Sequence, residues 1–172
     1  MLDSNACYGS SDPEVLHRGG MNATQIAWYR AMALQTNQVA GKTIPSLMAW
    51  HIPTTEYIDG AKAACYQKDS DEPTYTIGVD NIAQPGDFGY HGETFKSAWD
   101  AGDLHKYMLE VGTDGVFNGH SHRNNVSIGY GGVRWTFALK IGLYDREGPT
   151  QGGTLVTVHE DGFTVEHVVV SE

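Results

Sequence analysis

The sequence predicts an α/β fold that ends in antiparallel hairpins. Two observations predict it. Helical patterns alternate with short apolar runs up to residue 118, and after residue 122 the pattern changes to β. The chain has 172 residues, of which 40% are hydrophobic, and this is enough for one globular domain with a sizeable core.

The first helix and strand are predicted from local signals. Asn22 fits an N-cap, with Gln25 three residues on as in a capping box, and the apolar spacing that follows predicts a helix over residues 22–37. Residues 44–50 are mostly apolar and predict a buried strand, and residues 1–5 are interpreted as the end of an earlier strand. Strand, helix and strand together form the unit of a parallel sheet.

The second half of the chain repeats the helix and strand and then adds hairpins. Residues 95–111 have a helical pattern that Gly102 could break in two, and residues 114–118 predict the next strand. Glycine-containing turns then predict two hairpins, one pairing residues 126–130 with 133–139 and the other pairing 154–159 with 163–170.

Residues 54–93 are interpreted as a long functional loop or insertion within the same domain. Charged residues, glycine and proline alternate along this segment. A loop longer than ~15 residues in a compact domain is usually functional or disordered. We therefore expect the segment to cover a binding site.

Charge and composition limit the partners. A formal charge of −10 argues against binding the backbone of a nucleic acid and against an anionic membrane surface. No apolar segment approaches the ~18 residues of a membrane span. Because lysine and arginine are few, a phosphate substrate would need metal ions to neutralise it. Cys7 and Cys65 could form one disulfide or remain two buried thiols.

Histidines stand directly after two predicted strands. Gly119-His120-Ser121-His122 follows one apolar run, and His51 follows another. Ligands of open α/β sheets bind beyond the carboxyl ends of the strands, so the three imidazoles can converge there. Imidazole is the commonest protein ligand for metals, and Gly119 allows unusual backbone dihedrals or a close approach. The pattern favours a metal-assisted hydrolase, against histidines that are merely solvated or hydrogen-bonded.

The sequence around these histidines resembles a known family. Trp50-His51-Ile52-Pro53-Thr54-Thr55-Glu56-Tyr57, and residues 116–125 around Gly-His-Ser-His, resemble the calcineurin-like metallophosphoesterases, especially their branch related to purple acid phosphatases. The resemblance spans nearly the whole chain. It implies that residues 1–172 are the C-terminal part of a single phosphoesterase domain, that is, the C-terminal half of a β-sandwich flanked by helices (αββα) and ending in antiparallel hairpins.

The resemblance also implies a site. Enzymes of this family hydrolyse phosphate monoesters or diesters with two metal ions, which can be iron, zinc or manganese. The positions that match the family's ligands are His51 and His120 for one ion and His122 for the other. Glu56 and Tyr57 could orient an imidazole or simply pack, and Arg123 and Asn124 could contact phosphate or cap the loop.

The departures from the family pattern point to an incomplete site. The family's first half carries Asp-x-His, Gly-Asp-x-x-Asp or Asn, and Gly-Asn-His elements, and none of them occurs before His51. We therefore expect the missing N-terminal half to act in cis or in trans, or the chain to self-associate through an exposed sheet edge. Alone, the chain should be poorly active. A non-catalytic binding or assembly module and a three-histidine mononuclear zinc hydrolase are the alternatives.

The remaining histidines carry weaker expectations. His91 lies in the long loop and is either a solvated side chain or part of the lining of a substrate cleft. Four others have no spacing partner and receive no role: His17, His105, His159 and His167.

Overall fold

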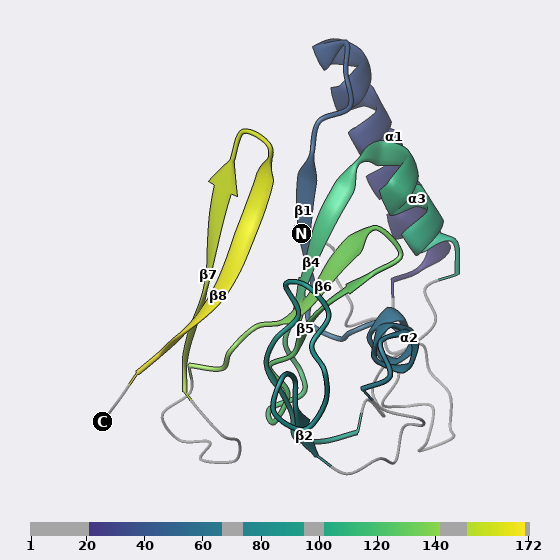
Figure 1. The fold of residues 1–172 in the computed structure, drawn as a ribbon. Coiled ribbons are helices and arrows are strands. Elements are labelled where there is room, and N and C mark those ends of the chain that lie inside the picture. The colour runs from purple at the N-terminus through teal and green to yellow at the C-terminus, as the bar shows by residue number, and fades with distance from the viewer. Residues whose placement is uncertain (1–20, 67–73, 95–101, 142–150, 171–172) are drawn as a thin grey trace, which may run out of the picture.

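The structure, a computed structural model, describes residues 21–66, 74–94, 102–141 and 151–170. Figure 1 shows helices α1 and α3 on one side of a small central sheet and the ribbon formed by β7 and β8 on the other. The predicted α/β class and the closing hairpins are confirmed. The strand expected at residues 1–5 and the first part of the helix expected at 95–111 lie outside the described residues.

Helix α1 (Ala23–Ala40) begins and ends as its local sequence predicts. The Asn22 side chain accepts from the Gln25 amide at 2.9 Å, and the Gln25 side chain accepts from the Asn22 amide at 2.9 Å, which completes the capping box. Gly41 ends the helix in the left-handed conformation, with φ of 67°. The helix runs three residues beyond the predicted end at residue 37 because no breaker stands before Gly41.

In the described residues, the central sheet has four strands in the order β1-β4-β6-β5. Their bounds are Ser46–Ala49 for β1, Thr113–Asn118 for β4, Ser127–Tyr130 for β5 and Val133–Phe137 for β6. β1, β4 and β6 are parallel, and β5 pairs antiparallel with β6. The hairpin turn at Gly131 and Gly132 has positive φ at both residues, as the predicted two-residue turn requires.

Residues 54–93 hold more regular structure than the predicted loop. They contain α2 (Glu56–Ala63) and the two-residue strands β2 (Tyr75–Thr76) and β3 (Tyr90–His91). Helix α2 packs on β5, where a Cβ added to Gly60 would lie 3.0 Å from the Tyr130 Cβ. Asp87 anchors the later part of this segment. Its carboxylate accepts from the Gly129 amide of β5 at 2.8 Å and from the Tyr66 hydroxyl at 3.0 Å.

The two faces of the sheet bury different partners. On the helical face, α3 (Leu104–Val111) buries Leu104, Met108 and Val111 in the core. On the other face, β8 (Gly162–Val169), paired with β7 (Gly152–His159), brings Phe163 against β4. A Cβ on Gly115 would lie 2.4 Å from the Phe163 ring, so that glycine lets the ribbon approach.

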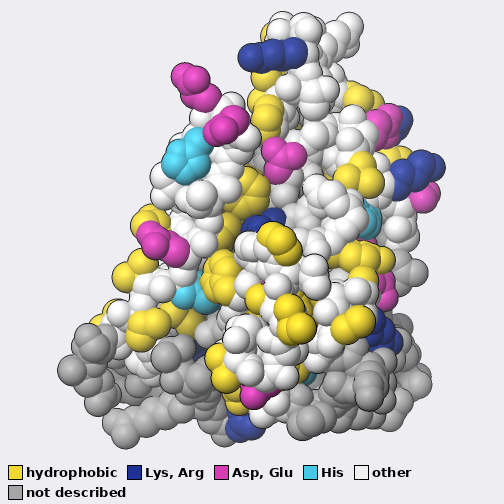
Figure 2. Space-filling model, viewed as in Figure 1, with side chains coloured by type: hydrophobic (Ala, Val, Ile, Leu, Met, Phe, Trp, Pro, Cys, Tyr) yellow, Lys and Arg dark blue, Asp and Glu magenta, His cyan; other side chains and the backbone are white. Residues whose placement is uncertain are grey.

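The charged side chains are dispersed. On the face shown in Figure 2, the Lys and Arg side chains of the described residues do not gather into a continuous basic surface.

Candidate metal centre

The carboxyl ends of β1 and β4 lie side by side and carry two of the predicted ligands. The Trp50 amide donates to the Phe117 carbonyl at 3.2 Å, and the Gly119 amide donates to the His51 carbonyl at 3.1 Å. These bonds continue the parallel pairing just past both strands. His51 and His120 therefore leave the sheet together, as their positions after adjacent strands predict.

The two imidazoles are in direct contact. His51 Nε2 and His120 Nδ1 are 3.2 Å apart, and the rings meet edge to face with 5.0 Å between centroids. Two nitrogens bound to one tetrahedral zinc ion at about 2.0–2.1 Å each lie about 3.3 Å apart. The pair therefore fits as two ligands of a single ion, and in its absence one nitrogen can donate a hydrogen bond to the other.

His122, the third predicted ligand, is close enough to act on His120 through charge. Burial, and then the neighbouring His51 and His122, lower the pKa of His120, while Glu93 raises it. The shift favours the neutral imidazole, which is the metal-binding form. Within the described ranges, however, no group of three or more His, Cys, Asp or Glu side chains is arranged to hold a metal ion. The structure thus assembles the His51–His120 pair without a third ligand.

The backbone is strained at His120 itself. His120 has φ of 70°, and the Ser121 amide donates to the Gly119 carbonyl at 2.9 Å across it. A bond from residue i+2 to residue i around positive φ is the rare, strained form of γ-turn. Gly119 does not have positive φ, and a Cβ there would lie 3.4 Å from His51 Nδ1, an ordinary contact. The expectation that Gly119 provides the unusual conformation is wrong.

A buried side-chain network joins the two strand ends beneath the pair. The Tyr57 hydroxyl donates to Asn118 Oδ1 at 3.0 Å, and Asn118 Nδ2 donates to the Trp50 carbonyl at 2.8 Å. Tyr57 is 0% exposed and Asn118 is 2% exposed. Tyr57 was predicted either to orient an imidazole or to pack; its hydroxyl bonds the Asn118 side chain, which in turn bonds the carbonyl that precedes His51.

A second network holds the loop after His122, and Asn124 is its centre. Asn124 Oδ1 accepts from the amides of Gly92 and Glu93 at 2.9 and 3.1 Å, and its Nδ2 donates to the Glu93 carbonyl at 3.0 Å. The Glu93 carboxylate in turn accepts from the Arg123 amide at 3.0 Å. Asn124 is therefore the loop cap that was one of its two predicted roles. The position of Glu93 beside the histidines had no signal in the sequence.

His91 is buried, although the sequence predicted either a solvated side chain or part of the lining of a substrate cleft. The side chain is 1% exposed and stacks on Tyr75 with ring centroids 4.8 Å apart. Burial lowers the pKa of His91 to about 4. The ring is thus neither solvated nor open to a cleft, and β3 carries it inward because alternate strand residues face opposite sides.

The other histidines of the described residues, to which the sequence assigned no role, make contacts away from the His51–His120 pair. His105 follows Asp103 as Asp-x-His, but its Nε2 lies 3.0 Å from the Gly131 carbonyl, at the opposite end of the sheet from His120. His167 Nε2 contacts the Asn125 carbonyl at 2.7 Å, which fastens β8 to the histidine loop. His159 lies on the exposed end of β7 near Thr164. His17 is outside the described residues.

Three buried polar atoms close to His51 in the sequence make no hydrogen bond within the described part of the chain. They are Trp50 Nε1, Thr54 Oγ1 and Glu56 Oε2. Buried polar atoms without a partner are uncommon in folded proteins and often mark functional sites. Cys65 is a free, exposed thiol rather than a buried one, and Cys7 lies outside the described residues.

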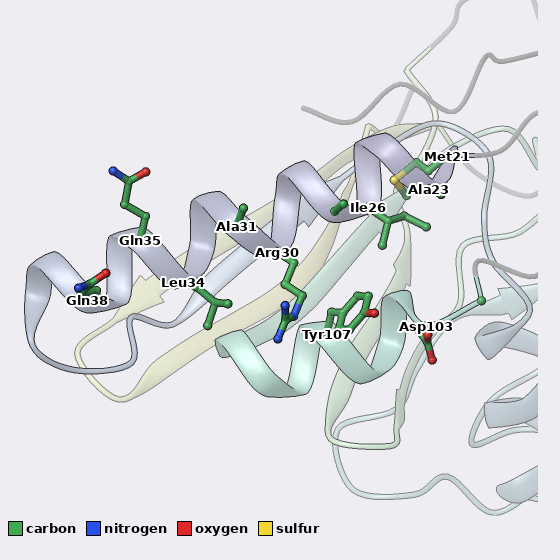
Figure 3. A pocket seen from close by; sticks show the side chains of 12 residues that line it. Met21, Ala23, Ile26, Arg30, Ala31, Leu34, Gln35, Gln38, Asp103 and Tyr107 are labelled. Carbon is green, nitrogen blue, oxygen red and sulfur yellow. The ribbon is translucent and has the colours of Figure 1, made fainter.

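One pocket lies on the helical side of the sheet, away from the histidines. It measures about 700 Å³ and lies between α1 and α3, with Arg30, Leu34 and Tyr107 in its wall (Figure 3). Arg30 is held there by Glu110 and lies 5.0 Å from the centroid of the Tyr107 ring. Among the described residues that line the pocket there is no histidine or cysteine.

Comparison with known proteins yields no matching family model, curated protein or solved structure. None of the helices in the described ranges has the length and apolar character that crossing a bilayer requires.

Proposed function

We propose that this chain supplies part of the metal site of a phosphoesterase, an enzyme that hydrolyses phosphate monoesters or diesters. One observation carries the proposal: His51 Nε2 and His120 Nδ1 lie 3.2 Å apart at the carboxyl ends of adjacent parallel strands. The sequence resemblance to calcineurin-like metallophosphoesterases supports the reaction class, and the C-terminal half of their β-sandwich is the finer fold that we propose.

The proposed roles follow from the donor chemistry. His51 and His120 hold one iron, zinc or manganese ion, and His122 contributes to a second. When bound, two such ions would supply positive charge for the phosphoryl oxygens and a water activated at neutral pH. The chain's own residues orient these ligands: Asn118 fixes the strand ends, and Asn124 fixes the loop that carries His122.

The proposed site needs ligands beyond these three imidazoles. Neutral imidazoles offset none of the positive charge of two cations, and a single histidine holds the second ion weakly. A carboxylate from a further residue would supply negative charge to such a site. We propose that it comes from a preceding segment, in cis or in trans. The Glu93 carboxylate raises the pKa of His120, but its Oε1 accepts a hydrogen bond from the Arg123 amide.

A second candidate function is a non-catalytic binding or assembly module built on the same scaffold. The observation that favours it is that no third metal ligand is assembled in the described ranges. A mononuclear zinc site of His51, His120 and His122 lies between the two candidates. The number of zinc ions per chain separates the three: two in a complemented enzyme, one in a mononuclear site and none in the module.

Hydrolysis of p-nitrophenyl phosphate with excess manganese or zinc tests the proposal. We expect little activity from the 172-residue chain alone and a large gain when the upstream coding segment is added in trans. His120→Ala should abolish that gain, while His159→Ala, which removes an exposed imidazole on β7, should keep it. Full activity from the chain alone, lost in His120→Ala, would refute the shared site. No gain with the upstream segment would favour the non-catalytic module.

A further inference from the structure

The separation between His51 and His120 depends on how two strand ends are held. Each imidazole belongs to a residue just beyond its strand, and β1 has only four residues and, among the described strands, one hydrogen-bonded neighbour. Main-chain bonds fix the register of the two ends. They do not fix the orientation of the peptide before His51 or of the turn before His120. Because the ring atoms lie several bonds from this backbone, a small backbone shift displaces the rings further.

Asn118 spans this junction with one side chain. Its Nδ2 donates to the carbonyl of Trp50, the residue directly before His51, and its own backbone leads through Gly119 into His120. The Asn118 carbonyl accepts from the Ala138 amide at 2.7 Å, so the residue is also fastened to the chain beyond β6. A single buried amide therefore sets the positions of both histidine-bearing segments.

Tyr57 determines which way that amide faces. Its hydroxyl donates to Asn118 Oδ1 at 3.0 Å, which directs Nδ2 toward the Trp50 carbonyl. The ring packs against Phe137 with 4.3 Å between centroids and against Trp135 with 6.0 Å, so the hydroxyl cannot easily move. Burial also raises the pKa of Tyr57 well above its usual value, which keeps the hydroxyl protonated and able to donate.

We propose that Tyr57 and Asn118 are positioning residues that hold the His51–His120 pair at a metal-binding separation. The proposal rests on the proposed metal site, but the separation of the His51 and His120 rings can be observed in the metal-free chain. Groups that orient the ligands of a metal without touching it typically change metal affinity about 10–100-fold when removed. A hydroxyl that only stabilised the fold would change stability and leave metal affinity unaltered.

The structure offers a matched control for Tyr57→Phe. Tyr29 is a buried tyrosine on α1 whose hydroxyl bonds the Thr113 hydroxyl at the opposite end of β4. Tyr29→Phe and Tyr57→Phe each remove one buried hydroxyl that contacts β4. Only Tyr57→Phe removes one from the histidine end. Asn118→Ala is the second variant of the network, and Tyr57→Phe keeps the test valid if that variant folds poorly.

The experiment has two readouts. In the metal-free chain, we expect the nuclear Overhauser contact between the His51 and His120 rings to weaken in Tyr57→Phe and to persist in Tyr29→Phe. In a zinc titration, we expect affinity to fall about 10-fold or more in Tyr57→Phe and less than twofold in Tyr29→Phe. Unchanged ring contact and zinc affinity in Tyr57→Phe would overturn the positioning role. If the ring contact responds as expected but the wild-type chain binds no zinc, positioning stands and the proposed function fails.

Discussion

His120 combines a strained backbone with the most crowded imidazole of the site. Its φ of 70° belongs to a tight turn that carries the ring toward His51. Non-glycine residues in such conformations cost about 1–3 kcal/mol and persist where the surrounding structure enforces them. Here the enforcing contacts are the Gly119 amide on the His51 carbonyl and the Asn118 side chain beneath it.

Removing the side chain at this turn should stabilise the fold. We expect His120→Gly to raise the free energy of unfolding by about 1 kcal/mol, because relief of strain exceeds the extra backbone entropy that glycine loses on folding. The same change should remove the proposed metal ligand. His122→Gly, in the same loop at negative φ, should instead lower stability. Urea unfolding of both variants measures this, and a loss of stability in His120→Gly would contradict the strain.

The buried ring of His91 should make stability depend on pH. Its pKa falls from 6.5 when unfolded to about 4 when folded, so the unfolded chain binds more protons between these values. The free energy of unfolding therefore has its full value above pH 6.5 and decreases by up to about 3 kcal/mol as the pH falls toward 4. His91→Phe, which keeps the stack on Tyr75, should flatten this part of the stability profile. An unchanged slope between pH 6.5 and 4 in that variant would exclude His91 as its source.

For single residues, the place of a side chain in the fold could be predicted from the sequence, but the side chains that surround it could not. The rule that ligands gather at the carboxyl ends of parallel strands predicted that His51 and His120 would meet. The contacts of Asn118 and Tyr57 join residues 61 positions apart in the sequence and follow no local spacing. His91 looked like a loop residue because β2 and β3 are only two residues long.

Among the elements, the segment from Gly89 to Glu93 is the one that steadies the histidine loop. It runs close to residues 123–126, where the Asn125 amide donates to the Tyr90 carbonyl at 2.9 Å. A Cβ on Gly89 would lie 2.3 Å from the Asn125 carbonyl oxygen, and one on Gly92 would lie 2.5 Å from the Arg123 carbonyl oxygen. The approach of the two segments therefore depends on these glycines.

Gly89→Ala should accordingly be among the most damaging small changes. It combines a backbone clash with φ of 107°, and we expect a loss of about 3 kcal/mol or more in the free energy of unfolding. Gly41→Ala is the matched control, since its φ of 67° is also positive but no atom lies within 4 Å of the added Cβ. That control should lose only about 1 kcal/mol. Equal losses of stability in the two variants, measured by thermal unfolding, would show that the close approach of Gly89 to Asn125 does not add to the cost of the substitution.

Elements with strong local signals were predictable. α1 follows from its capping box, and the β5–β6 hairpin follows from Gly131 and Gly132. Helix α2 has only eight residues, and a glycine lies inside it, so its sequence favours a loop. The burial of its one apolar face against β5 overrides that preference, and such burial depends on tertiary structure.

At the scale of the whole molecule, the outer edge of β1 has no partner strand among the described residues. In the described part of the sheet β1 has one neighbour, β4, and beside it Trp28 on α1 and Leu47 on β1 are 55% and 38% exposed. Together with α1, this edge forms an apolar groove of about 270 Å³. An unpaired edge next to apolar side chains favours pairing with another strand.

We expect the chain to self-associate through this edge when no complementing segment is present. Leu47→Lys should reduce association, because charge on an edge strand opposes pairing. Leu109→Lys places the same charge on α3, where Leu109 is 53% exposed, and should leave association unchanged. Light scattering over a range of protein concentrations measures the result. A wild-type chain that stays monomeric at high concentration would rule this edge out as a self-association surface.

The central claim, that His51 and His120 together hold one metal ion, is tested most directly by zinc binding to histidine variants. The measurement is zinc content and affinity, by elemental analysis and titration, for the wild-type chain, His51→Ala, His120→Ala and the surface control His159→Ala. We expect the wild-type chain and His159→Ala to bind zinc with equal affinity and both other variants to lose the site. Zinc binding that is absent from the wild-type chain, or unchanged in His51→Ala, would contradict the claim.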